Sequence, residues 1–460
     1  MLRKNINKNT NNIIGILVIL LWSIISILNP NMYFFNGDEI HACQIAKHLN
    51  YAEIIQLMRA EGHTFLWYFL IKPFLQYDLF YPWIIKVINF IFMLGSIILL
   101  WCRSPFNIIT KTLIIFSYPF LLYYPTYARC YTIGIFLLFW LTILYDEKLK
   151  RPLLYSVLLF LTANTSLMAC IGAGAFGILF LNDIYREKKV SKIILVSSIG
   201  LLTLFSLYIQ WHDPIIPAYA EHVNFINNLK NTFFQFNSNY TNIKWLIIIG
   251  LFSSLLVPNI YFLKNKSACF IYTFTWTNLL ILFSQIYPGN PYHHYFGFIY
   301  LILAYWISCK NMQENNKRKV LFKIFFYYIC ICLIFIKTTK LPYQSQIYNW
   351  DFFPKEIAEI TNKNATIYAD LPSAWDIWDY QNYFNLKSYN NKKINDLENF
   401  MNIYKYVETY NILDYIKKME PNSYLLISDN KLAAARDYQE FNKKYKLVGR
   451  YQWRYLYKLD

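Results

Sequence analysis

Two adjacent carboxylates, Asp38 and Glu39, follow soon after the first apolar run of the chain, Ile13–Leu28. A carboxylate pair just outside a membrane helix can remove a proton as a general base, or it can hold a divalent cation. The pair can equally begin a helix, with Asp38 as the N-cap and Glu39 in the first turn. The local sequence leaves both interpretations open.

Further along the same segment, Glu61-Gly62-His63 precedes a second apolar run, Phe65–Tyr77. A carboxylate and an imidazole at a membrane surface could ligate zinc, and a solvated loop is the simpler alternative. The apolar run is short and contains Pro73. We therefore expect an interfacial or re-entrant helix there rather than a membrane span.

Arg129 lies in the sequence Tyr127-Ala128-Arg129-Cys130-Tyr131, between two long apolar runs. Its guanidinium group suits bidentate phosphate binding, although an arginine at the end of a span can also reach the lipid headgroups. A later Pro-Gly turn leads into His293 and His294. Adjacent helical side chains point about 100° apart, so at most one of the two is expected in a site, and an interfacial aromatic belt is the alternative.

The composition indicates a membrane protein. Of the 460 residues, 56% are hydrophobic, 20% are aromatic and 15% are charged, and the mean hydropathy is +0.24. Soluble domains carry about a quarter charged residues, so these values exclude a soluble enzyme, a disordered chain and a disulfide-rich secreted module. The eight cysteines form no CxxC pair and imply no disulfide framework or zinc ribbon. The sequence also has no nucleotide-binding motif.

Eleven apolar runs are candidates for membrane-spanning helices. They are 13–28, 80–101, 106–126, 129–145, 152–165, 166–182, 193–211, 244–263, 268–287, 294–309 and 319–338. With the N-terminus in the cytoplasm, the inner segments 1–12, 102–111, 146–151, 183–192, 264–267 and 310–319 contain 18 Lys and Arg. The outer side before residue 339 has five, namely Lys47, Arg59, Lys72, Arg129 and Lys230. This asymmetry fits the positive-inside rule, and it explains the net charge of +17 without a nucleic-acid partner.

This topology places all the histidines in outer loops, which predicts a polar site facing outward. The seven are His41, His48, His63, His212, His222, His293 and His294. Two outer loops are long, 31–79 and 212–243, and Asp38–Leu49 and Ala52–Ala60 in the first have the spacing of amphipathic helices.

From residue 339 the pattern changes from spans to alternating short elements. Strands are expected at Ala365–Asp370, Ser423–Asp429 and Tyr451–Leu459, and helices at Pro354–Thr361 and Ile412–Met419. The chain should therefore consist of a mainly α-helical transmembrane domain, 1–338, and a small α/β domain outside the membrane, 339–460. Within the tail, aromatic residues at 374–380 suit either carbohydrate stacking or core packing.

In this order the features resemble the GT-C superfamily of membrane glycosyltransferases, specifically bacterial enzymes similar to protein mannosyltransferases and the lipid A aminoarabinose transferase. The resemblance covers about residues 13–310. It rests on Asp38-Glu39 at the start of the first outer loop, on Glu61-Gly62-His63-Thr64-Phe65-Leu66-Trp67-Tyr68 at its end, and on Tyr127-Ala128-Arg129-Cys130-Tyr131 in the next outer turn. Thr64 replaces the proline that is usual in the family.

The resemblance implies a hexosyl or pentosyl transferase in the bacterial cytoplasmic (inner) membrane, with its active site and C-terminal domain on the periplasmic face. Such an enzyme passes a sugar from a polyprenyl-phosphate donor to an envelope glycan, lipid or protein acceptor, with inversion. Asp38 would be the general base, and Glu39 would orient either Asp38 or the acceptor. Arg129, with Tyr127 and Tyr131, would bind the donor phosphate.

Four further residues would line the site under the same resemblance: Glu61, His63, His293 and His294. No cofactor is required, and a divalent metal at Glu61 and His293 is allowed. Two other functions fit a polytopic membrane protein of this kind. One is a ligase or polymerase that uses a polyprenyl-diphosphate glycan, and the other is a transporter or flippase for a lipid-linked glycan.

Overall fold

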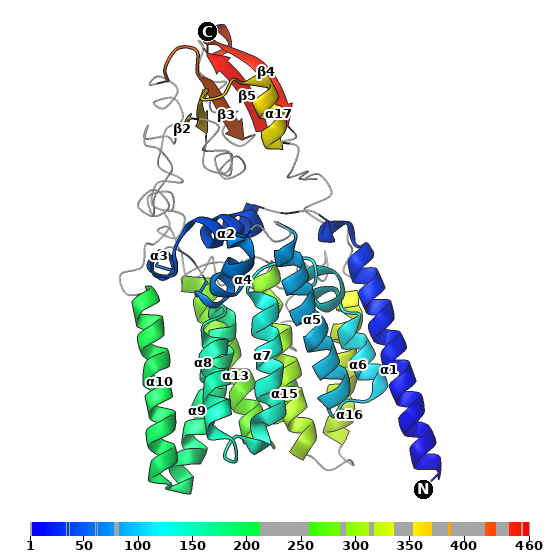
Figure 1. Ribbon diagram of the computed structural model, residues 1–460. Coiled ribbons are helices and arrows are strands. Elements are labelled where there is room, and N and C mark those ends of the chain that lie inside the picture. The colour runs from blue at the N-terminus through cyan, green and yellow to red at the C-terminus, as the bar shows by residue number, and fades with distance from the viewer. Residues whose placement is uncertain are drawn as a thin grey trace.

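The computed structural model describes residues 2–33, 35, 37–59, 61, 63–77, 82–211, 257–285, 291–311, 317–334, 353–369, 385–387, 419–428, 441–451 and 454–459. Within these residues helices dominate up to residue 334, and the strands come after it (Figure 1). The predicted outer loop 212–243 and most of the predicted span 244–263 lie outside the described residues.

Three short helices lie together at one end of a bundle of longer helices, and we call this end the loop end (Figure 1). The short helices are α2 (Gly37–His48), α3 (Tyr51–Leu57) and α4 (Leu66–Gln76). The bundle contains α1 (Leu2–Leu28), α5 (Ile84–Arg103), α6 (Ile108–Ile115), α7 (Tyr131–Leu144), α8 (Pro152–Ala163), α9 (Leu167–Glu187), α10 (Val190–Trp211), α13 (Lys266–Gln285), α15 (Phe296–Asn311) and α16 (Lys317–Ile334).

Five of these helices are long and apolar enough to cross a membrane. They are Asn11–Leu28, Ile84–Arg103, Leu167–Glu187, Val190–Gln210 and Lys266–Gln285. Shorter apolar helices cover Pro152–Ala163, Phe296–Lys310 and Val320–Ile334. The structure thus agrees with a helical membrane protein, and the count of eleven spans and their orientation stay predictions.

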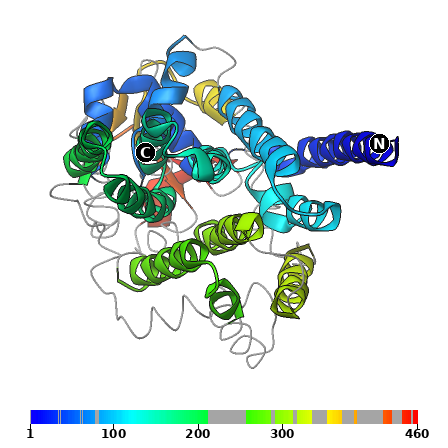
Figure 2. The same ribbon diagram turned by 90° about the horizontal axis from the view of Figure 1, so that it is seen from below.

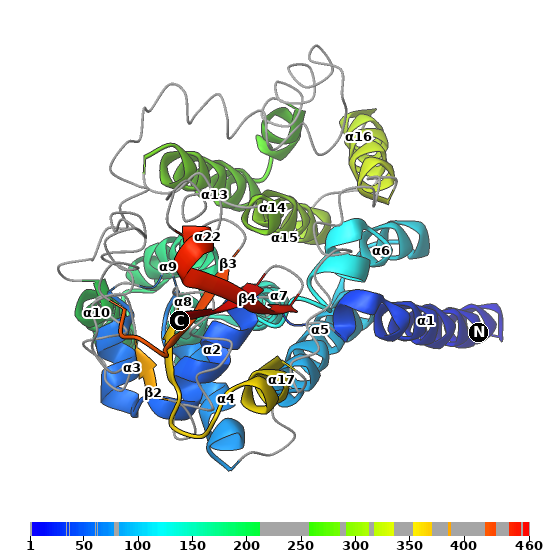
Figure 3. The same ribbon diagram turned by 90° about the horizontal axis from the view of Figure 1, so that it is seen from above.

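The two amphipathic segments of the first long loop are helical as expected, and they appear as α2 and α3. The short apolar run that contains Pro73 forms α4, which packs against α2. Helix α3 packs against α10 at the same end. Viewed from above in Figure 3, these three helices lie over one side of the bundle.

The predicted span 106–126 is not one continuous helix. Helix α6 ends at Ile115, and a short π-helix, η2 (Pro119–Tyr123), follows it. Pro119 lacks a backbone N–H and cannot continue an α-helix, which explains the break. The backbone from Phe120 onward therefore needs hydrogen-bond partners from elsewhere in the bundle.

Helix α1 supplies several of those partners. Trp22 Nε1 donates to Phe120 O at 2.8 Å, and Ser26 Oγ donates to Leu121 O at 2.9 Å. Asn29 Nδ2 donates to Leu122 O at 3.2 Å. Trp22 and Ser26 lie one turn apart and share one helix face, and Asn29 follows directly after the end of α1. Seen from below in Figure 2, α1 is at the edge of the bundle, where it contacts α5, α6 and η2.

The C-terminal strands form a five-stranded mixed sheet in the order β2-β1-β3-β5-β4. Its strands are β1 (Thr366–Ala369), β2 (Asn385–Lys387), β3 (Tyr424–Ser428), β4 (Tyr445–Tyr451) and β5 (Arg454–Leu459). Strand β1 pairs in parallel with β2 and β3, and β5 pairs antiparallel with β3 and β4.

The predicted strands 365–370, 423–429 and 451–459 correspond to β1, β3 and β5, and the predicted helix 354–361 corresponds to α17 (Phe353–Ile360). The aromatic segment 374–380 lies outside the described residues, as does the predicted helix 412–419 apart from its last residue.

Close helix packing around α7 yields a first prediction. A Cβ atom on Gly134 would lie 2.9 Å from Ala169 Cβ and 3.1 Å from Thr165 Oγ1. We expect Gly134→Ala to destabilise the protein by about 1–3 kcal/mol through overpacking. Gly177→Ala is the control, because nothing lies within 4 Å of its Cβ position. Melting temperatures in detergent should fall only for Gly134→Ala, and an unchanged value for it would contradict the packing.

Candidate active site at the loop end of the bundle

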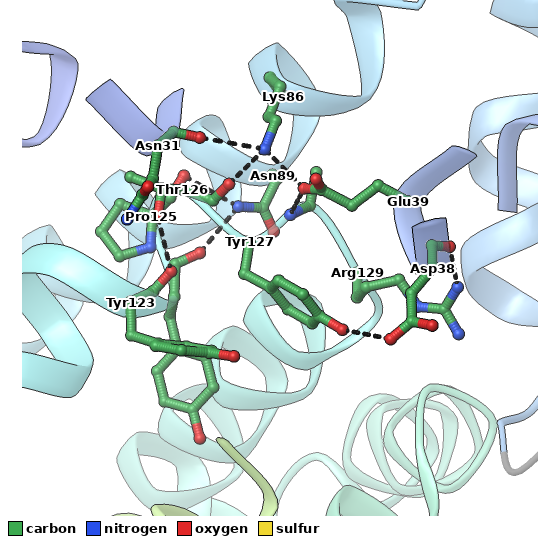
Figure 4. A network of polar contacts seen from close by, with 12 residues as sticks. Asn31, Asp38, Glu39, Lys86, Asn89, Tyr123, Pro125, Thr126, Tyr127 and Arg129 are labelled. Carbon is green, nitrogen blue, oxygen red and sulfur yellow. Dashed lines mark hydrogen bonds and ion pairs between the residues drawn. The ribbon is translucent and has the colours of Figure 1, made fainter. Parts of the chain in front are cut away.

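Asp38 lies in the first turn of α2, which begins at Gly37. The expected N-cap position is therefore wrong, since Asp38 is the second residue of the helix. Its carboxylate Oδ2 accepts a hydrogen bond from Tyr127 Oη at 2.6 Å, and its backbone carbonyl accepts one from Arg129 Nη1 (Figure 4). Asp38 is exposed. Asp38 is thus open to solvent, and the turn that carries Arg129 holds both its carboxylate and its backbone carbonyl.

Glu39 points into the protein rather than toward solvent, and it is 1% exposed. Its Oε1 lies 2.6 Å from Lys86 Nζ of α5 and accepts a hydrogen bond from Ala128 N. These contacts assign Glu39 to holding α2 against α5 and against the turn before Arg129. The adjacent carboxylates therefore have different surroundings, because successive residues of a helix point in different directions.

Arg129 is a buried cation at the centre of the site, with 4% of its surface exposed. Besides its bond to the Asp38 carbonyl, its Nη2 lies 3.8 Å from Glu61 Oε2. Among the described residues its Nε has no hydrogen-bond partner. A buried guanidinium with an unused donor is suited to binding an anionic group of a ligand.

Glu61 is buried in a cage of polar side chains. His41 Nε2 lies 2.5 Å from Glu61 Oε1, and Tyr68 Oη donates to Oε2 at 3.1 Å. Burial alone would raise the pKa of the Glu61 carboxyl, but attraction to His41, its hydrogen bond and the charge of Arg129 lower that pKa well below its usual value. Glu61 is therefore ionised and balances the positive charge of Arg129.

His63 and His293 meet at the hydroxyl group of Tyr131. The Tyr131 oxygen lies 2.8 Å from His293 Nε2 and 3.3 Å from His63 Nε2, while His63 Nδ1 lies 3.5 Å from Cys130 Sγ. Burial and the charge of Arg129 lower the pKa of His63 to about 3. Burial and the neighbouring His63 also lower the pKa of His293. Both imidazoles are thus neutral at neutral pH.

His294 has different surroundings from His293. It is buried, and its ring lies 4.5 Å from that of Phe283 on α13.

Tyr127 stacks on Tyr131 with 6.1 Å between ring centroids and 17° between planes. The structure therefore joins Tyr127, Tyr131 and His293 to the same polar site.

The loop that carries Glu61 and His63 is fixed to the helices behind it. His63 forms an isolated β-bridge with Ser166, and Leu66 N donates to Asn164 O at 3.1 Å. Phe65 N donates to the side chain of Gln210 at 3.0 Å. The segment that the sequence suggested as a solvated loop is therefore tied to the α8–α9 turn and to α10.

The described residues contain no group of three or more His, Cys, Asp and Glu side chains arranged to hold a metal ion. Glu61 instead contacts His41, Tyr68 and Arg129, and His293 contacts Tyr131. A metal at Glu61 and His293 stays a prediction from the resemblance.

The sequence did not single out Lys86, and it named His41 only as one of the seven outer-loop histidines. A lysine inside an apolar run is costly and often functional, so Lys86 could have been singled out by that signal. His41 lies three residues after Asp38 on a helix, and that spacing places them near one helix face.

No family model and no curated protein matches the chain.

The neutral state of His63 yields a pH prediction. In the unfolded chain a histidine takes up a proton near pH 6.5, whereas His63 in the folded protein does so only near pH 3. The unfolded state therefore binds more protons between these values, and stability falls as the pH is lowered from about 6.5 toward about 3. Melting temperatures measured across this range should fall less for His63→Gln than for the wild type. His48→Gln, at an exposed position of α2, should follow the wild type; a parallel fall for His63→Gln would contradict the assignment.

Proposed function

We propose that the protein is an inverting glycosyltransferase of the bacterial cytoplasmic membrane. It transfers a sugar from a polyprenyl-phosphate donor to an envelope acceptor at the outer face. In this proposal the loop end of the bundle faces outward, the N-terminus is in the cytoplasm and the C-terminal α/β domain is outside. The resemblance to GT-C enzymes and the charge distribution of the loops support this assignment.

The observation that carries the proposal is the pairing of an exposed carboxylate with a buried guanidinium. Asp38 offers its carboxylate to solvent, and its own backbone carbonyl holds Arg129. Sugar transfer from a phosphate ester needs both groups, because a hydroxyl must lose a proton while negative charge develops on the leaving phosphate. The two groups come from α2 and from the turn before α7, so the fold brings them together.

In the proposed reaction, an acceptor hydroxyl attacks the anomeric carbon of the sugar from the face opposite the phosphate. Asp38 takes the hydroxyl proton as the new carbon–oxygen bond forms. The bond between the anomeric carbon and the phosphate oxygen breaks, and its electron pair leaves with the polyprenyl phosphate. Arg129 stabilises the negative charge on that phosphate, as preorganised cations do in other transferases.

The remaining residues would shape the site. Tyr127 holds the Asp38 carboxylate in place through its hydroxyl group. Neutral His63 and His293 contact the Tyr131 hydroxyl and do not compete with Arg129 for the phosphate. Ionised Glu61 balances the charge of Arg129.

The role of Asp38 predicts a large loss of activity in Asp38→Asn, since an amide cannot accept the proton. We expect release of polyprenyl phosphate from a panel of polyprenyl-phosphate sugars to fall by about 10²–10⁴ in nanodiscs with a crude envelope acceptor. Asp146→Asn, a carboxylate beyond the other end of α7, is the matched control. Near-normal release by Asp38→Asn would refute the base assignment. Release of polyprenyl diphosphate from a diphosphate-linked glycan would instead favour the ligase or polymerase.

The role of Arg129 predicts weaker donor binding in Arg129→Lys, because a lysine cannot reproduce the forked donors of the guanidinium. We expect the KM for the donor to rise and the transfer rate to fall by about 10²–10³, as for loss of one preorganised donor. Arg103→Lys, at an exposed position at the far end of α5, is the control. Normal donor binding by Arg129→Lys would exclude a phosphate-binding role.

A further inference from the structure

Three consecutive backbone carbonyls before Tyr127 are bound by two side chains of one helix (Figure 4). Asn89 Nδ2 donates to Tyr124 O at 2.8 Å and to Pro125 O at 3.0 Å. Lys86 Nζ donates to Thr126 O. Lys86 and Asn89 are three residues apart on α5, so they lie on the same helix face.

The same two side chains also reach segments on either side of the turn. Lys86 Nζ lies 2.6 Å from Glu39 Oε1 of α2 and 3.4 Å from Asn31 O, just after α1. Asn89 Oδ1 accepts a hydrogen bond from Thr132 Oγ1 at 2.7 Å, in the first turn of α7. The residues between these anchors include Tyr127 and Arg129.

Both side chains are buried at a substantial cost. Lys86 is 2% exposed and Asn89 is 0% exposed, on a helix that is otherwise apolar enough to span a membrane. An ion or an amide withdrawn from water must be matched by nearly ideal partners to be tolerated. Here the partners are backbone carbonyls of the turn before Tyr127 and the carboxylate of Glu39, which is next to Asp38. Lys86 and Asn89 therefore hold groups that belong to the candidate site.

We propose that Lys86 and Asn89 are positioning residues for the transfer reaction. They fix the backbone from Tyr124 to Thr132 against α2, and they thereby set Arg129 and the Tyr127 hydroxyl against Asp38. They act through these residues and touch neither donor nor acceptor. The expected loss of transfer rate rests on the proposed function. The hydrogen bonds from Lys86 and Asn89 to the turn are a property of the fold and do not depend on that function.

The test uses full-length protein in nanodiscs and two variants. In the double variant Lys86→Met/Glu39→Gln both charges are replaced by neutral groups of similar size, so no buried charge is left unpaired. Asn89→Leu removes the hydrogen bonds of the Asn89 amide alone. It provides the test if the double variant does not fold. Ser96→Ala is the control, because Ser96 is buried on the same helix and donates only to Phe92 O of its own helix.

The first readout is hydrogen–deuterium exchange, which does not depend on turnover. We expect faster exchange confined to residues 124–132 and 37–41 in both variants, with exchange elsewhere and in Ser96→Ala as in the wild type. The second readout is the split between kcat and KM. We expect kcat to fall by about 10–100-fold, because a displacement of about 1 Å can cost 10² in rate. The KM for the acceptor should stay within about twofold.

Unchanged exchange in the turn of a folded variant would overturn the proposal, as would faster exchange with an unchanged kcat. A wild type without turnover would instead refute the proposed function. The exchange result would then still decide whether Lys86 and Asn89 hold the turn. The two proposals can therefore fail separately.

Discussion

The need to bind the carbonyls of a non-α-helical segment inside an apolar bundle governs much of this structure. From Phe120 to Thr126 each carbonyl accepts a hydrogen bond from a side chain or from the turn itself. Irregular backbone at membrane depth is stable only where protein groups replace water. The donors from α1 and α5 therefore also determine where these helices pack, and the segment they hold leads directly into the candidate site.

The charges at the site are arranged so that each buried ion has a partner. Glu39 pairs with Lys86, and Glu61 faces both His41 and Arg129. Breaking one member of such a buried set would leave an uncompensated charge, which is strongly unfavourable. The exposed residue Asp38 lies outside these pairs, and under the proposed function its carboxylate would meet the acceptor hydroxyl. The separation of structural carboxylates from a solvent-facing one is what a single general base requires.

The neutral and the charged side chains of the candidate site also occupy different positions. Half-buried His63 and buried His293 share the Tyr131 hydroxyl, and desolvation and the charge of Arg129 lower their pKa values and keep them neutral. Around the Tyr131 hydroxyl the positive charge therefore lies on Arg129 and not on His63 or His293. Under the proposed function, Arg129 would hold the donor phosphate, and the neutral side chains would face the uncharged sugar.

The sequence by itself determined the membrane character, the helices after Asp38 and the strands near Thr366–Ala369, because hydropathy and local periodicity depend only on neighbouring residues. It also selected Asp38, Arg129 and Glu61 by residue type and position. Only the tertiary structure decided that Glu39 is buried against Lys86, 47 positions away, while Asp38 stays exposed. That difference arises because the packing of α2 on α4, together with the ion pair to α5, sets which direction from the helix leads inward, and such packing cannot be read from local spacing.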